Sequence, residues 1–163
     1  SKPEEISDKD WAYSMDGTLN SVYRSIREVI PYLKKNKSGG RIINVGSMYG
    51  VVSPQFAIYD RNPEFLNPPH YGAAKAGVIQ LTRYFAAYLG KHGILVNSIT
   101  PGAFPSEKVQ QKKSFTDALK QRTMVGRVGK PEDLKGAFVF FSSDASQYIT
   151  GQNLVVDGGF TAW

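Results

Sequence analysis

Arg41-Ile-Ile-Asn-Val45 is a short apolar run rich in β-branched residues, and the small residues Gly46 and Ser47 follow it directly. Such a run, with little polar alternation, is typical of a strand buried on both faces of a parallel sheet. Comparable runs occupy Ile94–Ile99 and Gln152–Val156. The sequence therefore predicts three buried strands.

Helical patterns separate these runs. From Trp11 to about Lys35, apolar residues recur at three- and four-residue spacing, and Ser7 with Asp10 resembles a capping box before this helix. A second long helix is predicted over 71–89, and a third begins at 130–134, where a proline occupies the first turn. Alternating helices and strands predict an α/β fold with a parallel sheet and right-handed crossovers.

Two segments lack these patterns. Val51–His70 contains four prolines, which argue against regular structure. Ala103–Gly126 is polar and is expected to be flexible, with a helix around Ser114–Arg122.

Composition limits the class of protein. A chain of 163 residues predicts one domain, and it contains no apolar run long enough to span a membrane. The first ten residues are polar and mixed in charge, unlike a signal peptide. The absence of cysteine excludes disulfides and suits a reducing cytoplasm, and two histidines without a zinc-binding spacing argue against a metal site.

The net charge of +6 is concentrated at Lys34–Lys37 and Lys108–Arg122. A solvated helix end and a solvated loop explain both clusters. Neither is interleaved with aromatic residues, so nucleic acid is not expected as a partner. A basic rim can attract an anionic ligand such as a dinucleotide.

Ligands of parallel α/β sheets bind beyond the carboxyl ends of the strands. Ser47 and Thr100-Pro-Gly102 follow two of the predicted strands, and the loop from this edge leads to Tyr71. Tyr71 and Lys75 are four residues apart and share a helix face. An ammonium group favours the phenolate form of a nearby tyrosine, so this pair can transfer a proton. The spacing alone occurs about as often as chance predicts.

Five motifs together resemble, in order, the C-terminal half of the short-chain dehydrogenase/reductase family: Gly40-Arg-Ile-Ile-Asn-Val-Gly-Ser-Met-Tyr-Gly50, Tyr71-Gly-Ala-Ala-Lys-Ala-Gly77, Gly93-Ile-Leu-Val-Asn-Ser-Ile-Thr-Pro-Gly102, Gly126-Arg-Val-Gly-Lys-Pro-Glu-Asp-Leu134 and Gly151-Gln-Asn-Leu-Val-Val-Asp-Gly-Gly159. The resemblance implies a Rossmann-like doubly wound parallel sheet. It also implies an NAD(P)-dependent oxidoreductase that interconverts an alcohol and a ketone.

The resemblance assigns catalytic roles residue by residue. Tyr71 matches the general acid/base, Lys75 the lysine that favours its phenolate, and Ser47 the hydroxyl that hydrogen-bonds the reacting oxygen. Thr18 falls where the family usually has a catalytic asparagine, and a local shift would make Asn20 the equivalent instead. Threonine offers no amide, so the resemblance leaves the proton relay open at this position.

Cofactor contacts are implied at Tyr71 and Lys75, which hold the nicotinamide ribose, and at Pro101-Gly102, Phe104 and Ser106 near the nicotinamide. The sequence does not decide between NAD and NADP, because the family distinguishes them at the adenosine ribose, with residues that follow its second strand.

Two departures from the family pattern shape the expectations. Ser47 and Tyr71 are 24 positions apart, wider than usual, and the extra material at Phe56–Pro69 is expected to shape the substrate pocket. The chain has no glycine-rich strand-to-helix turn. We therefore expect residues 1–163 to form a single partial domain, the catalytic half of a dinucleotide-binding fold, that lacks the main cofactor-binding half.

Several alternatives stay open. A weaker similarity to bacterial members linked to flagellin glycan and acidic-sugar biosynthesis implies a sugar or sugar-nucleotide substrate. The family also implies a homodimer or homotetramer through helices 11–35 and 71–89. A non-catalytic, decayed domain acting in oligomerisation or binding is the alternative function. His70 is interpreted as a loop residue, Asp157-Gly-Gly159 as a structural strand end, and Tyr49 as either a pocket or a packing residue.

Overall fold

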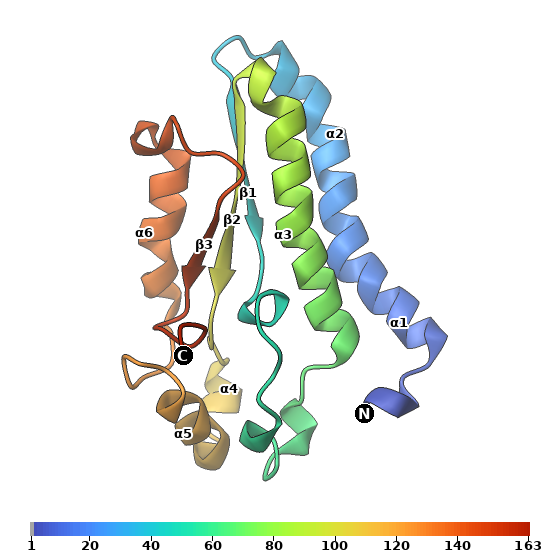
Figure 1. Cartoon of the computed structure of the whole chain (residues 1–163), viewed down its shortest axis with the longest axis vertical. Helices are drawn as coiled ribbons and strands as arrows, with labels where there is room; N and C mark the ends of the chain where they lie inside the picture. Colours follow the sequence, from blue (N-terminus) through green and yellow to red (C-terminus); the bar gives the residue numbers. More distant parts are fainter. Residues whose placement is uncertain (1) are drawn as a thin grey trace.

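The computed structural model describes residues 2–163 and contains a three-stranded parallel sheet in the order β1-β2-β3. The strands are β1 (Gly40–Val45), β2 (Ile94–Pro101) and β3 (Asn153–Val156). Helices α2 (Ser21–Lys35) and α3 (Pro69–Leu89) cover one face, and α6 (Pro131–Ser142) covers the other (Figure 1). The α/β fold and all three strands are therefore confirmed.

The central strand β2 is buried because helices cover both faces of the sheet. Ile94, Val96 and Ile99 are fully buried, as their uninterrupted apolar run predicts. One core cluster joins this strand to Ile26 of α2 and Leu89 of α3. The apolar stripe of each helix thus anchors it to the sheet.

The first long helix begins directly after Ser7, the predicted cap residue, and is interrupted. It begins as α1 (Asp8–Met15), where the Ser7 hydroxyl accepts the Asp10 N–H at 3.1 Å. A π-helical turn, η2 (Asp16–Asn20), then connects α1 to α2 (Figure 1). In this turn the Ser21 N–H bonds to the Asp16 carbonyl, one residue further back than in an α-helix.

The second long helix begins at Pro69 rather than at Tyr71. Proline suits the first helical turn because it has no N–H to leave unsatisfied. The expectation that 51–70 lacks regular structure was also wrong in part, since it contains the 3₁₀ turns η4 (Phe56–Ile58) and η5 (Pro63–Phe65).

The segment 103–126 contains the helix predicted around Ser114–Arg122, together with one short helix that was not predicted. It folds into α4 (Glu107–Gln110) and α5 (Lys113–Gln121). Phe115 and Leu119 are buried from α5 in a second core cluster, together with residues of the 3₁₀ turn η3 (Met48–Gly50). These two apolar side chains attach an otherwise polar helix to the strand ends.

Figure 1 shows α4 and α5 at the end of the molecule toward which the strands point. Within residues 2–163, no helix combines the length and the apolar character needed to cross a membrane.

Candidate active site

The site lies where the strands end. Ser47 follows β1 and caps η3, where its Oγ accepts the N–H of Tyr49 at 3.2 Å. Among residues 2–163, the Ser47 O–H itself donates to no protein acceptor. Its proton therefore remains available for a ligand oxygen.

Two glycines let η3 approach α3 closely. A Cβ on Gly72 would lie 2.8 Å from the carbonyl oxygen of Tyr49, and a Cβ on Gly50 would meet the backbone of Lys75 and Ala76. Because neither glycine carries a side chain, the turn that holds Ser47 packs directly on the helix that carries Tyr71.

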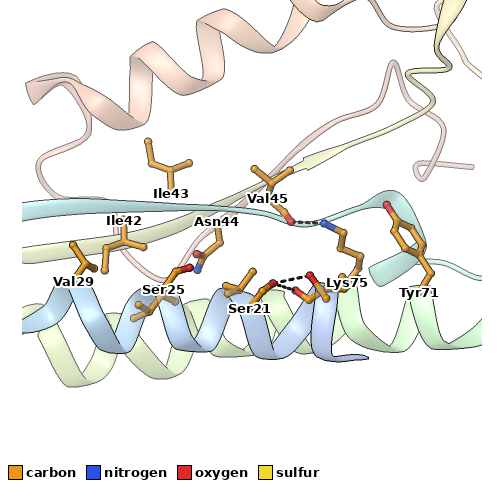
Figure 2. A pocket seen from close by; sticks show the side chains of 13 residues that line it. Ser21, Ser25, Val29, Ile42, Ile43, Asn44, Val45, Tyr71 and Lys75 are labelled. Carbon is orange, nitrogen blue, oxygen red and sulfur yellow. Dashed lines mark hydrogen bonds between the residues drawn. The ribbon is translucent and has the colours of Figure 1, made fainter. Parts of the chain in front are cut away.

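A first cavity of about 650 Å³ runs along the outer edge of β1 (Figure 2). Its lining comes from η2, α2, β1 and the start of α3: Gly17, Thr18, Ser21, Val22, Ser25, Ile26, Val29, Ile42, Ile43, Asn44, Val45, Tyr71 and Lys75. Figure 2 shows Tyr71 and Lys75 extending from α3 toward the end of β1.

Lys75 is held beside Tyr71 by the backbone of β1. Its Nζ donates to the Val45 carbonyl at 2.9 Å and lies 5.8 Å from the centroid of the Tyr71 ring. The Gly46 N–H bonds to β2, and successive residues of a strand alternate in direction, so the Val45 carbonyl faces away from β2. Burial lowers the pKa of Lys75, because desolvation disfavours its charged form.

The structure separates Thr18 from Asn20. Thr18 lines the first cavity together with Tyr71 and Lys75. The Asn20 amide instead donates to the Asp16 carboxylate at 3.2 Å, outside the cavity lining. The π-helical turn that contains Thr18 is the kind of helix irregularity that recurs at functional sites.

A second cavity, of about 230 Å³, lies on the other side of Tyr71. It is bounded by η3, α4, α5 and the segment before α3, and its lining is Ser47, Met48, Tyr49, Tyr59, Phe65, Asn67, Tyr71, Gly102, Ala103, Phe104, Pro105, Val109, Phe115 and Leu119. Tyr71 thus lines both cavities.

Two further tyrosines form a pair in the second cavity. The hydroxyls of Tyr49 and Tyr59 are hydrogen-bonded to each other, and both residues are buried. Burial, then the hydrogen bond with Tyr59, raises the pKa of Tyr49, with a smaller contribution from Tyr71. Tyr49 is therefore both a pocket residue and a packing residue.

The remaining predicted contacts are only partly brought together. Gly102 and Phe104 line the second cavity, and the backbone of Gly102 packs against Asp157. Pro101 ends β2 and lines neither the first nor the second cavity. Ser106 is exposed ahead of α4, with its side chain making no capping bond.

Asp157 and His70 were interpreted as residues without a catalytic role, and the structure shows where each lies. The Asp157 carboxylate accepts the N–H groups of Gly159 and Thr161 at 2.8 and 2.7 Å, so it is a turn-capping group as expected. His70 lies in the first turn of α3 rather than in a loop, which corrects that interpretation. Its ring packs edge-on against Trp11 with centroids 6.0 Å apart.

Sequence reasoning did not single out Tyr59, Phe65 or Phe115, which all line the second cavity, although the first two lie in the segment Phe56–Pro69 that was expected to shape the pocket. Their aromatic character was the available signal. However, the proline-rich context of Tyr59 indicated irregular chain, and the polar helix predicted around Phe115 gave no sign that this residue faces the pocket.

Comparisons with known proteins place this geometry among oxidoreductases. A family profile described as enoyl-(acyl carrier protein) reductase matches residues 1–161. The chain is 37% identical to 2-dehydro-3-deoxy-D-gluconate 5-dehydrogenase from Dickeya dadantii, over 97% of this chain and 59% of that protein. It is 36% identical to galactitol 2-dehydrogenase (L-tagatose-forming) from Cereibacter sphaeroides, over 98% of this chain and 60% of that protein.

The crystal structure of a short chain dehydrogenase from Leptospira borgpetersenii with bound NAD+ is also similar. It superposes with a TM-score of 0.87 at 36% identity, and the match covers 99% of this chain and 60% of that one. The chain thus spans about 60% of the length of these relatives.

Proposed function

Because the chain belongs to the short-chain dehydrogenase/reductase family, we propose that it carries the proton-transfer groups of an NAD(P)-dependent oxidoreductase. The reaction is the interconversion of an alcohol and a ketone. The observation that carries the proposal is the position of Tyr71, which lines one cavity with Lys75 and Thr18 and another with Ser47.

In this proposal Tyr71 exchanges a proton with the substrate oxygen in the second cavity. Ser47 donates a hydrogen bond to the same oxygen, because its own O–H has no protein acceptor among residues 2–163. The Lys75 ammonium stabilises the negative charge that develops on the phenol oxygen. Such preorganised donors lower the barrier because they are in place before the charge forms.

Thr18 is proposed to hold a water molecule that connects Tyr71 to solvent through the first cavity. Its place in the cavity lining supports this role, and the engagement of the Asn20 amide with Asp16 argues against the alternative residue. A hydroxyl can accept one proton of such a water and donate its own.

The chemistry of the residues fits one end of a nicotinamide cofactor. Lys75 has three N–H donors and uses one on Val45, so two remain for ribose hydroxyls. Gly102 and Phe104 would lie against the nicotinamide, which supplies or accepts the hydride when bound. The described residues include no glycine-rich turn from a strand into a helix, so they match the nicotinamide-ribose end only. Both NAD and NADP remain candidates.

We also propose that the protein is a homodimer or homotetramer that associates through α1–α3. Exposed tyrosines on these helices support this surface, among them Tyr32, Tyr84 and Tyr88.

The absence of cysteine supports a reducing, cytoplasmic location. The names of the relatives favour a sugar-derived alcohol or ketone as substrate. The link to flagellin glycan biosynthesis stays a prediction.

The test uses the protein at its full natural length. NADH and NADPH are titrated while thermal unfolding is followed, and turnover is measured for wild type, Tyr71→Phe and the exposed control Tyr148→Phe. We expect a cofactor to raise the unfolding temperature and Tyr71→Phe to lower kcat by about 10²–10⁴-fold. Retained turnover in Tyr71→Phe would contradict the role of Tyr71. No response to either cofactor, together with no turnover, would favour the non-catalytic alternative.

A further inference from the structure

The second cavity contains a feature that the proton-transfer groups do not use, namely the hydrogen-bonded hydroxyls of Tyr49 and Tyr59. We propose that the substrate is an uncharged polyol or ketose, and that this tyrosine pair binds one of its hydroxyl groups away from the reacting carbon. The inference rests on the proposed function and narrows its substrate class.

Among residues 2–163, no charged side chain lines the second cavity. Its polar groups are the hydroxyls of Ser47, Tyr49, Tyr59 and Tyr71 and the amide of Asn67. Lys75 lines the first cavity instead, where its ammonium is bound to the Val45 carbonyl. A carboxylate or phosphate in the second cavity would lose part of its hydration without gaining a cation from the lining, which is unfavourable. A neutral substrate loses much less.

The tyrosine pair can both donate and accept. Each phenol has one O–H and two lone pairs, so a pair that shares one hydrogen bond keeps a second O–H and free lone pairs. Burial keeps Tyr49 in its neutral, proton-bearing form. Polar groups that face a largely apolar pocket cost free energy unless a ligand group satisfies them. A substrate hydroxyl has the complementary donor and acceptor.

The pair is also fixed relative to the reacting groups. Tyr49 lies two residues after Ser47, whose Oγ accepts the Tyr49 N–H. Tyr59 packs against Phe115 with ring centroids 5.6 Å apart, and Phe65 packs against the same ring at 4.7 Å. A hydroxyl bound by the pair therefore sets the position of the substrate relative to Ser47 and Tyr71.

Size points to a small substrate. The cavity volume of about 230 Å³ is below the roughly 300–1,000 Å³ typical of pockets for drug-sized ligands. This favours a polyol or ketose over a sugar nucleotide. Relatives of similar identity are named for a sugar acid and for a neutral polyol, so their names do not decide the charge, whereas the lining does.

The first experiment compares matched substrates with the full-length protein: galactitol with galactonate, glucitol with gluconate, and 2-heptanol as an apolar secondary alcohol. We expect kcat/KM for the neutral polyol to exceed that for the matched acid by about tenfold or more. Preference for the acid or for 2-heptanol would overturn the inference. Because either preference requires turnover, both leave the proposed oxidoreductase function standing.

The second experiment measures Tyr49→Phe, Tyr59→Phe and the control Tyr148→Phe with the preferred neutral polyol. We expect KM to rise about tenfold in each cavity variant, with a smaller change in kcat, because a buried substrate hydroxyl loses its partner. A purely structural role would instead lower the unfolding temperature and kcat without this effect on KM. An unchanged KM in both folded variants would refute the role of the pair, and having two positions guards against a single misfolded variant.

Discussion

A Cβ placed on Gly50 would lie 2.7 Å from the backbone carbonyl carbon of Lys75. The turn after β1 therefore touches α3 backbone to backbone, and the catalytic candidates on the two elements depend on this contact. Ser47 begins the turn, and Tyr71 lies one helical turn before Lys75.

Gly50→Ala tests this contact. The added methyl group meets backbone atoms that cannot rotate away, so we expect a loss of about 1–3 kcal/mol in the free energy of unfolding. Displacement of Ser47 is expected to lower kcat about tenfold or more. Urea unfolding and steady-state kinetics measure both effects. Gly90→Ala is the matched control, since a Cβ there meets nothing within 4 Å. Equal free energies of unfolding for the two variants would show that the contact between this turn and α3 does not limit stability.

Thr18→Val removes a hydroxyl from the first cavity and nearly preserves the side-chain shape. We expect kcat to fall about tenfold or more, the range of a weakened proton-transfer path, while the unfolding temperature changes little. Asn20→Ala is the comparison, because its amide binds Asp16 outside the cavity lining. A larger loss of kcat in Asn20→Ala than in Thr18→Val would exchange the two assignments.

Asn153→Ala is expected to weaken the junction between β2 and β3. The Asn153 Oδ1 accepts the hydroxyls of Ser98 at 2.8 Å and Thr100 at 2.7 Å, and both of these residues are fully buried. Asn153→Ala leaves the Thr100 hydroxyl unpaired and the Ser98 hydroxyl with only a longer contact to the Gln152 carbonyl at 3.4 Å, so we expect a loss of about 1–3 kcal/mol in urea unfolding. Adding Thr100→Val to Asn153→Ala removes one orphaned hydroxyl and should recover part of the loss. Simple additivity of the two substitutions would argue against the bond.

Stability at low pH depends on Asp133. A hydrogen bond from Arg127, followed by one from the Lys130 N–H, lowers the pKa of Asp133 to about 2 from 3.8. A lowered carboxyl pKa means that stability is present above pH 3.8 and is lost as pH falls through 2. We therefore expect Asp133→Asn to be less stable than wild type at pH 6, with the difference shrinking toward pH 2. Urea unfolding across this range checks it. In an Arg127→Gln background, Asp133→Asn should lower the free energy of unfolding at pH 6 by a smaller amount.

The order of elements was predictable because it depends on apolar periodicity. The runs at 41–45 and 94–99 became β1 and β2, and the alternation of helix and strand placed helices on both faces of the sheet. Strand direction also predicted that Ser47 and Tyr71 would meet at one edge. These conclusions need only local patterns and general rules of parallel sheets.

The parts that sequence reasoning missed depend on few residues or on contacts between distant segments. Helix α5 was predicted, but its overall polarity gave no sign that Phe115 and Leu119 bury it against the strand ends. Tyr59 is buried by a partner ten residues earlier in the chain, Tyr49, which no local spacing reveals. Ser106 was assigned by motif position alone, and the structure exposes it.

The π-helical turn at Asp16–Asn20 also acts as a phase shift. Each residue of an α-helix turns the chain by about 100°, so one extra residue rotates α1 relative to the stripe that α2 buries. As a result, α2 can face the sheet while α1 faces the start of α3, and the helix remains continuous between them. Deleting a single residue within this turn would restore an ordinary α-helix and rotate everything before it. Such a deletion would change the direction of the side chain at position 18 and the surface that α1 presents at the same time. The proposed proton path and the packing of the N-terminal helix therefore depend on the same turn.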